Sequence, residues 1–329
     1  MCLVLESIEW IIWIITPACN LSCIHCYTTL YSRDKMLGLN DIERVLSEAV
    51  DIGIEHIHYT GGEPFTRRDI IDILEATLDY GLTTSVFTNT TLLGEGEIKY
   101  LAKRDIPVYT SFDAPYKELF EEIRGRGVWD RVLENIQRLM DSGVPVHVNI
   151  CVSKKNYMVV GKTIEFLLGL GVESISLIPA MPTGRALSNK VYVGRDEYLY
   201  ALRQAEDKAC EYGVDIAVWC TPFIASIEWA KHLYGGNCRY WNVLDIAPNG
   251  DALLCDVIGV RVANVVRDGL RESWRKVLEH PLYRKAMEIP DTCRGCSIAS
   301  YCRGGCYART YLLYNRVGVE KDPLCPIEF

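Results

Sequence analysis

Cysteine is the residue type that stands out in this sequence, because the chain has 14 cysteines among its 329 residues. Three of them follow the spacing Cys19-x3-Cys23-x2-Cys26 directly after an apolar run. Thiolates at this spacing fit a tight loop that can wrap a compact centre of a soft metal. Three ligands for a four-iron cube would leave one iron open to an outside group. The alternative is a structural zinc ion, for which His25 is the obvious fourth ligand.

A second group of seven cysteines lies in the C-terminal part of the chain. Their spacing is Cys238-x11-Gly250-x4-Cys255, then Cys293-x2-Cys296-x5-Cys302-x3-Cys306, then Cys325. Two structural zinc sites would use this number of cysteines almost as well as two iron–sulfur clusters. The choice of metal at these positions therefore depends on the N-terminal group.

The four remaining cysteines are interpreted as ordinary residues. Cys2, Cys151 and Cys210 have no neighbouring cysteine and are expected to be small buried hydrophobic residues. Cys220 could join the second group if the chain folded back, but a buried structural thiol is the preferred interpretation.

The elements that must position these cysteines alternate between short apolar runs and longer amphipathic segments. We expect strands at residues 9–16, 54–60, 83–89, 107–112, 144–152 and 172–179. We expect helices at residues 40–51, 67–80, 95–103, 129–141, 157–168 and 195–212. Six β-α units in succession predict an α/β fold with a parallel sheet, open or curled into a partial barrel. Ligands of such a sheet bind at the carboxyl ends of its strands.

A second motif joins the first cysteine group in resembling a known superfamily. Gly61-Gly62-Glu63-Pro64 stands at the end of the second expected strand. The cysteine spacing on the loop after the first strand, followed by this GGEP motif, resembles the radical S-adenosylmethionine (SAM) enzymes, from about residue 9 to residue 190. The resemblance implies a [4Fe–4S] cluster on the three N-terminal cysteines, with SAM on its open iron. One electron from the cluster would cleave SAM to a 5′-deoxyadenosyl radical, which abstracts hydrogen from a substrate.

The resemblance also assigns the GGEP motif to SAM binding. Gly61 and Gly62 carry no Cβ, so they would let the backbone approach the methionine amino group closely. Glu63 and Pro64 would hold that turn and its hydrogen bonds.

Five further residues are expected to contact SAM on the same grounds. His25 would pack near the adenine, with Tyr27 at the adenine edge. Ser111 and Arg124 would bind the SAM carboxylate and ribose, and Asn149 on the fifth expected strand points to the same end of the sheet. No residue is assigned as a catalytic acid or base.

The seven C-terminal cysteines resemble the complete SPASM pattern, a module that follows the barrel in many radical SAM enzymes of peptide modification. The resemblance implies two auxiliary iron–sulfur clusters of the [4Fe–4S] type. It assigns Cys238, Cys255 and Cys306 to the first auxiliary cluster, and Cys293, Cys296, Cys302 and Cys325 to the second.

One position departs from the SPASM pattern. Some members place an eighth cysteine six residues after the first, and here that position is Leu244. Tyr240, Asp245 and Asp251 are the nearest candidates for the missing ligand. The first auxiliary cluster would therefore have an open iron, a non-cysteine ligand or a lower nuclearity.

Together these patterns predict a partial (β/α)6 TIM-like barrel at residues 1–215 and a small cysteine-rich SPASM module at residues 216–329. In the module, only one clear helix is expected, at residues 271–279. The leading functional hypothesis is a radical SAM oxidoreductase or maturase that oxidatively modifies a peptide or protein side chain. A ferredoxin or flavodoxin would supply its electrons. About eight residues precede the first expected strand, which weighs against an N-terminal leader-peptide-binding domain.

Two other functions remain open. The segments at residues 302–309 and 322–326 also resemble radical SAM enzymes of alternative haem biosynthesis, which implies side-chain modification of a tetrapyrrole of the haem or haem d1 type. Sugar, cofactor or lipid substrates are less favoured alternatives. A non-enzymatic iron–sulfur carrier is the third hypothesis.

Charge and hydropathy narrow the possible partners. The 35 Lys and Arg residues against 43 Asp and Glu give a net charge of −8, which argues against electrostatic binding of nucleic acid. The most apolar stretch, residues 10–15, is too short to span a bilayer. No Lys or Arg precedes Arg33, although a signal peptide needs a basic start. We therefore expect a cytoplasmic protein, where clustered thiols bind metal rather than form disulfides.

Overall fold

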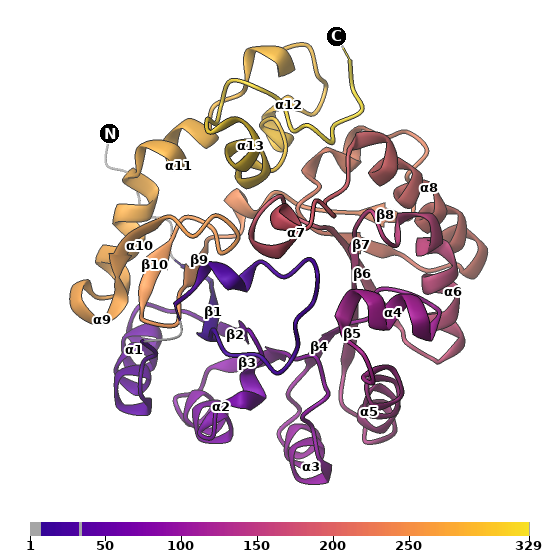
Figure 1. Cartoon of the computed structure of the whole chain (residues 1–329). Helices are drawn as coiled ribbons and strands as arrows, with labels where there is room; N and C mark the ends of the chain where they lie inside the picture. Colours follow the sequence, from indigo (N-terminus) through magenta and orange to yellow (C-terminus); the bar gives the residue numbers. More distant parts are fainter. Residues whose placement is uncertain (1–7, 33–34, 329) are drawn as a thin grey trace.

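The computed structural model describes residues 8–32 and 35–328. This part of the chain forms one sheet of 11 strands in the order β11-β10-β9-β1-β2-β3-β4-β5-β6-β7-β8. Figure 1 shows the sheet curling around an open centre, with helices outside it and the C-terminal segment along one side. The two edge strands, β11 and β8, do not pair with each other in the described residues, so the barrel is incomplete.

The first six strands confirm the expected parallel sheet. Each pairs in parallel with the next. Their bounds are β1 Trp10–Thr16, β2 His56–Gly61, β3 Thr83–Phe87, β4 Val108–Ser111, β5 Val146–Val152 and β6 Ser174–Pro179. Crossover helices connect these parallel strands and lie outside the sheet in Figure 1.

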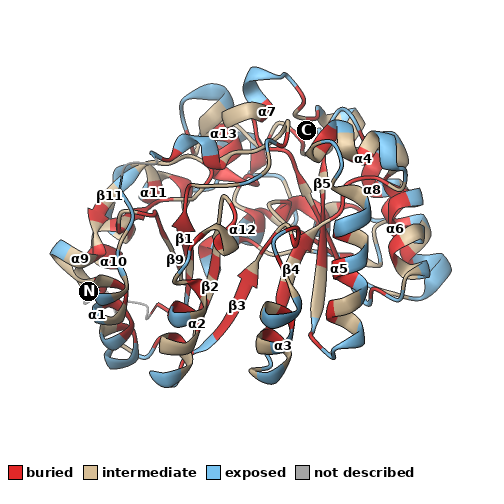
Figure 2. Cartoon of the chain, turned by 60° about the horizontal axis from the view of Figure 1, so that its bottom comes forward, coloured by how far each residue is buried: buried red, intermediate tan, exposed pale blue. Residues whose placement is uncertain are grey.

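The expected helices are also present. They are α1 Leu39–Asp51, α2 Ile70–Asp79, α3 Glu95–Lys103, α5 Trp129–Asp141, α6 Val160–Gly169 and α8 Arg195–Tyr212. Each is amphipathic, and in α5 the residues Val132, Ile136 and Leu139 recur at helical spacing and are buried. Figure 2 shows this division, with buried residues along the strands and exposed residues on the outer faces of the helices. Two short helices, α4 Lys117–Arg124 and α7 Gly184–Ser188, were not expected.

The two faces of the sheet differ in chemistry because successive side chains of a strand point to opposite sides. Ile57, Tyr59, Val86 and Val108 belong to the hydrophobic core beneath the helices. The alternate residues of the same strands therefore face the centre of the barrel, where polar side chains predominate. Closed TIM barrels fill this space with branched apolar side chains, so the interior here has a different use.

The C-terminal segment continues the same sheet at both of its edges. β7 Ile216–Val218 and β8 Leu233–Tyr234 follow β6 in parallel order. At the other edge, β9 Val243–Ile246 pairs in parallel with β1, and β10 Asp251–Leu253 and β11 Arg261–Asn264 form an antiparallel extension. The boundary at residues 215 and 216 stays a prediction, and strands on both sides of it share one sheet.

The expectation of a single helix in the C-terminal segment is wrong. Five α-helices lie there among the described residues: α9 Val265–Asp268, α10 Leu270–Glu279, α11 Pro281–Ala286, α12 Ala299–Cys302 and α13 Tyr307–Tyr314. Only α10 is long enough for its apolar residues to show a clear helical period, which is why the sequence predicted it and missed the four shorter ones. No helix in the described part of the chain has the length and hydropathy needed to cross a membrane.

Candidate metal and cofactor site

The three N-terminal cysteines lie on the loop that follows β1 and crosses the open centre of the barrel in Figure 1. Hydrogen bonds reach their sulfur atoms from the loop itself. The Leu21 N–H donates to Cys19 Sγ at 3.4 Å, and Thr28 Oγ1 lies 3.1 Å from Cys26 Sγ. Such hydrogen bonds to sulfur set the potential of an iron–sulfur cluster. The loop therefore supplies hydrogen bonds of the kind that surround the sulfur ligands of a metal cluster.

A distant segment holds this loop in place. At the start of α7, the Arg185 N–H donates to the carbonyl of Cys26 at 2.9 Å, and Arg185 Nη1 donates to the carbonyl of Cys23 at 3.2 Å. Gly184 has a φ of +51°, and a Cβ built there would lie 2.6 Å from the Cys26 carbonyl oxygen. Only glycine combines this backbone conformation with such a close approach.

The GGEP motif packs against the chain immediately before Cys19. A Cβ on Gly61 would lie 2.5 Å from the Thr16 carbonyl oxygen, and a Cβ on Gly62 would overlap the Ala18 carbonyl. The Gly62 N–H also donates to the Thr16 carbonyl at 2.7 Å. The close approach that the structure contains is thus to the β1 backbone. An approach to the SAM amino group stays a prediction.

Glu63 ties this turn to the end of β3. Its buried carboxylate accepts hydrogen bonds from the Phe65 N–H at 3.1 Å, Thr88 Oγ1 at 2.7 Å and the Asn89 N–H at 2.6 Å. Burial raises the pKa of Glu63 to about 7, although these three donors oppose the rise. Glu63 therefore holds the turn and its hydrogen bonds, which is the structural role expected of it.

His25 and Arg124 meet at a buried carboxylate that the sequence did not single out as a site. Asp113, just after β4, accepts from His25 Nε2 at 2.9 Å and from Arg124 Nε at 2.6 Å. Burial alone would raise the pKa of Asp113, but the charges of Arg124 and His25 bring it below its usual range. Arg124 Nη1 also lies 3.9 Å from Cys23 Sγ. Roles for His25 and Arg124 at SAM remain predictions, and both side chains are already oriented by Asp113.

The other expected SAM contacts gather at the same end of the sheet. Ser111 is the last residue of β4 and lies opposite Asn149 of β5. Asn149 donates to Ser176 Oγ at 2.7 Å. Tyr27, next to the third cysteine, donates to Asp256 Oδ2 at 2.7 Å. Asp256 follows Cys255, so this bond joins the N-terminal cysteine loop to the C-terminal cysteines.

Neutral polar and aromatic side chains line the inner wall of the barrel. His58 shares a hydrogen bond with Ser85 at 2.7 Å, and its ring contacts that of Tyr109 edge-on at 5.0 Å between centroids. His147 stacks on Trp219 with centroids 5.3 Å apart. Burial lowers the pKa of His58 to about 3 and that of His147 to about 4, so both rings are neutral near pH 7. β2 to β7 contain no Lys, Arg, Asp or Glu.

The C-terminal cysteines form two groups in space. Cys293, Cys296, Cys302 and Cys325 line a single hollow together with apolar residues such as Phe223. Cys255 and Cys306 belong to another cluster of packed side chains, and Cys238 is near enough to both to influence their pKa. The interleaved ligand assignment made from the sequence, and the bound clusters themselves, stay a proposal.

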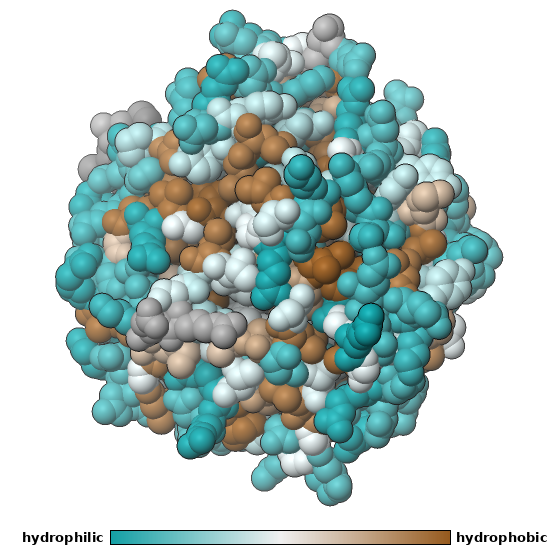
Figure 3. Space-filling model, viewed as in Figure 1, coloured by the Kyte–Doolittle hydropathy of each residue, from teal (hydrophilic) through white to brown (hydrophobic). Residues whose placement is uncertain are grey.

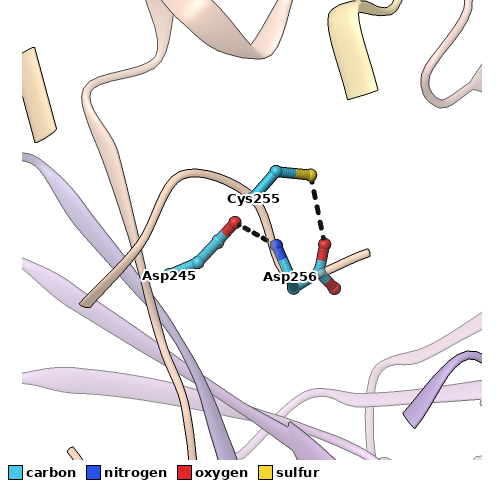
Figure 4. A group of neighbouring side chains, drawn as sticks. All are labelled: Asp245, Cys255 and Asp256. Carbon is cyan, nitrogen blue, oxygen red and sulfur yellow. Dashed lines mark hydrogen bonds between the residues drawn. The ribbon is translucent and has the colours of Figure 1, made fainter. Parts of the chain in front are cut away.

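One group of potential metal ligands is closely spaced. Among the described residues, one group of three or more Cys, His, Asp or Glu has its ligand atoms within 4.8 Å of one another, namely Asp245, Cys255 and Asp256. Figure 4 shows that hydrogen bonds join Asp256 to the other two. The identity of the metal at the C-terminal cysteines stays a prediction.

Comparison with known proteins decides the family. The family model described as the radical SAM superfamily matches residues 13–167. Residues 13–167 form a radical SAM domain. The family's [4Fe–4S] cluster and SAM are thereby its expected cofactors. The matched region contains the cysteine loop, the GGEP turn and the Asp113 site.

Relatives of this radical SAM enzyme match it over nearly its whole length. An AdoMet-dependent heme synthase of Methanosarcina barkeri is 26% identical over 96% of this chain and 95% of its own. A PqqA peptide cyclase of Granulibacter bethesdensis is 24% identical over 95% of this chain and 86% of its own. SuiB of Streptococcus suis, solved with S-adenosylmethionine and with its precursor peptide SuiA, has the same fold with a TM-score of 0.78. It is 22% identical over 98% of this chain, and about three quarters of the SuiB chain is covered.

One interpretation of a single cysteine in this radical SAM enzyme is wrong. Cys210 is exposed, because it lies on the solvent side of α8 rather than in the core. Cys220 packs in the same cluster of side chains as Cys255 and Cys306, and its interpretation as a structural thiol stays a prediction. Cys220 and Cys306 are 86 residues apart in the chain, so the spacing of cysteines in the sequence could not predict that they pack in one cluster. Cys2 lies outside the described residues.

The three candidates for a further ligand of the first auxiliary cluster are placed very differently. The Tyr240 hydroxyl donates to the Ser300 carbonyl at 2.8 Å, and the side chain is 41% exposed. Asp251 accepts from Asn264 within the β10–β11 extension. Of the three, Asp245 lies beside Cys255, which is one of the cysteines expected to hold that cluster. Figure 3 shows apolar surface on this face of the molecule, next to the C-terminal segment at the top of the view.

Proposed function

We propose that this radical SAM enzyme oxidatively modifies a side chain of a peptide or protein, with two auxiliary iron–sulfur clusters in its C-terminal segment. The observation that carries the proposal is the 2.7 Å hydrogen bond from Tyr27 to Asp256. Tyr27 follows Cys26 and Asp256 follows Cys255, so this bond supports the proposal that the two expected cluster sites are neighbours. An oxidation that begins with hydrogen abstraction needs an electron acceptor nearby, and this arrangement provides one.

The residues of the chain would divide the work as follows. When bound, SAM and the clusters supply hydrogen-atom abstraction and one-electron transfer. Cys19, Cys23 and Cys26 hold the first cluster, and the GGEP turn fixes the loop that carries them. The inner wall of the barrel orients the substrate through imidazole, hydroxyl and amide groups. These groups are neutral, so they suit an uncharged side chain.

The names of two similar proteins support a peptide substrate. One is a PqqA peptide cyclase, and the other, SuiB, was solved with its precursor peptide SuiA. A reductant of the ferredoxin or flavodoxin class would supply electrons to the N-terminal cluster.

Tetrapyrrole side-chain modification is the second candidate, and one observation favours it. The heme synthase of M. barkeri matches 95% of its own length, compared with 86% for the peptide cyclase. Tetrapyrroles with several propionate groups call for cationic partners. The absence of Lys and Arg from β2 to β7 weighs against such a substrate inside the barrel.

The proposal is tested by offering both kinds of substrate to the reduced, iron-loaded enzyme. A synthetic peptide library that presents every side-chain type and a propionate-bearing porphyrin are supplied separately with SAM. We expect the peptides to raise the rate of 5′-deoxyadenosine release, and a subset of them to lose the mass of two hydrogens. Stimulation by the porphyrin alone would replace the proposal with the second candidate, and stimulation by neither would contradict both.

A further inference from the structure

We propose that Cys220 is the fourth protein ligand of the first auxiliary cluster, beside Cys238, Cys255 and Cys306. This inference rests on the proposed auxiliary clusters and adds a ligand that the spacing of the SPASM pattern does not contain. The ligand comes from the end of a barrel strand rather than from the C-terminal cysteine run.

The backbone at Cys220 has a left-handed conformation that is rare for a residue other than glycine. Cys220 follows β7 by two residues and has a φ of +53°, in the left-handed region that non-glycine residues rarely adopt. The next residue fixes the turn, because Thr221 Oγ1 donates to the Trp219 carbonyl at 2.9 Å and also shares a hydrogen bond with Tyr198 at 2.7 Å. Backbone strain of this kind persists where surrounding contacts over-determine it, and it clusters at functional sites.

The turn brings the Cys220 side chain to the other thiols. Cys220 packs against the cluster of side chains that contains Cys255 and Cys306. The Cys220 and Cys306 thiols lie close enough to shift each other's pKa, and Cys238 and Cys255 are the other thiols that raise the pKa of Cys220. Four cysteines from four separate segments therefore converge on one place, which is the number that a [4Fe–4S] cluster uses.

A buried ion pair fixes the backbones of Cys220 and Cys306 relative to each other. Arg309 Nη1 donates to Asp322 Oδ2 at 2.6 Å, and the side chains of both residues are at most 2% exposed. Asp322 Oδ2 also accepts from the Cys306 N–H at 2.8 Å. Arg309 Nη2 donates to the carbonyl of Cys220 at 2.9 Å. One guanidinium–carboxylate unit thus positions both cysteines, as second-sphere groups do around metal ligands.

The competing oxygen ligand is less suited to the position. Asp245 lies beside Cys255, and its carboxylate already accepts from the Asp256 N–H at 2.9 Å. Iron–sulfur clusters are held by thiolates as a rule, and soft ligands select them. Cys220 offers a thiol that packs in one cluster of side chains with Cys255 and Cys306.

The test uses the full chain in which Cys19, Cys23 and Cys26 are all replaced by Ala, so that only auxiliary clusters remain. After anaerobic reconstitution we expect this chain to hold about eight irons, four in each cluster. Adding Cys220→Ala should leave one iron without a protein ligand. We then expect about seven irons after mild oxidation, together with the EPR signal of a three-iron cluster.

Matched variants keep the result interpretable. Cys210→Ala removes the exposed cysteine of α8 and should leave iron content and EPR signal unchanged. Asp245→Asn should also leave them unchanged. Cys220→Ser keeps the size of the side chain, so it covers the case in which the Ala variant does not fold. Adding 2-mercaptoethanol to Cys220→Ala should suppress the three-iron signal, because a small thiol can occupy the vacant position.

Two outcomes would overturn the inference, and they can be told apart. If the parent chain with Cys220 intact binds zinc or no iron, the auxiliary clusters of the proposed function fail, and this inference fails with them. If the parent chain holds about eight irons and Cys220→Ala keeps them without a three-iron signal, the clusters stand and Cys220 is not a ligand. The same signal in Asp245→Asn instead would assign the position to Asp245.

Discussion

At the scale of single residues, Glu63 shows how the GGEP motif acts through the fold. Its carboxylate has three donors, and burial still dominates its pKa. Asp113 is the opposite case, because the charges of Arg124 and His25 outweigh the effect of burial. The number and charge of the partners decide the direction of each shift. Both carboxylates fix chain segments that carry the cysteine loop or adjoin it.

Glu63→Gln is predicted to change how stability depends on pH. The pKa of Glu63 is raised from 4.5 to about 7 in the folded chain, so its stabilising contribution is complete below about pH 4.5 and is lost as pH rises through 7. Gln cannot ionise and does not show this loss. The stability deficit of the variant relative to wild type should therefore shrink between pH 5 and pH 8 by about 2–3 kcal/mol. Anaerobic chemical unfolding at several pH values measures this, and a deficit that does not change with pH would contradict it.

Gly184→Ala is predicted to disturb the cysteine loop from the opposite side of the site. A Cβ there would meet the Cys26 carbonyl oxygen at 2.6 Å, at a φ that disfavours Ala. We expect a cost of about 1–3 kcal/mol and a loss of iron from the N-terminal cluster. Gly96→Ala in α3 is the matched control, because nothing lies within 4 Å of its added Cβ and Ala favours a helix. The iron content of the two variants is measured and compared. Equal iron content would contradict the inference that the close contact between Gly184 and Cys26 holds the cysteine loop in place.

At the scale of elements, the sequence was sufficient for the β-α repeat and insufficient for the pairing of β9 with β1. The strands of the repeat are short apolar runs, and α3, α5 and α8 begin and end at the expected residues. Their patterns are local, which is why they could be predicted. The pairing of residues 243–246 with β1 joins segments more than 200 residues apart, and no local pattern reports it. The exposure of Cys210 and the position of Cys220 depend on tertiary packing in the same way.

The pair formed by Arg309 in α13 and Asp322 is predicted to anchor the C-terminal elements. Both side chains are buried, so Arg309→Met should cost about 3–5 kcal/mol, because it leaves an uncompensated carboxylate. The double variant that also carries Asp322→Asn should recover part of this loss. Arg275→Met removes an exposed pair on α10 and should cost less than about 1 kcal/mol. Thermal unfolding of the four chains measures the effect, and equal losses in Arg309→Met and Arg275→Met would contradict it.

At the scale of the whole molecule, the sheet brings two sets of cysteines to one place. The N-terminal loop follows β1, and the first auxiliary cysteines flank β9, the neighbour of β1 in the sheet. The GGEP turn, the Asp113 site and the Tyr27–Asp256 bond all lie at the carboxyl end of these parallel strands. The sequence alone was enough to predict that both groups of cysteines bind metal. It was not enough to predict that the two groups lie close together across the β1–β9 pair, because that depends on the fold.

SAM cleavage by the reduced chain tests the central claim most directly. The iron-loaded protein is incubated with SAM and a strong one-electron reductant under anaerobic conditions, and 5′-deoxyadenosine is quantified. We predict that the wild-type chain forms 5′-deoxyadenosine and that the variant with Cys19, Cys23 and Cys26 replaced by Ala forms none while keeping about eight of about twelve irons. A wild-type chain that is loaded with iron and reduced but leaves SAM intact would contradict the account.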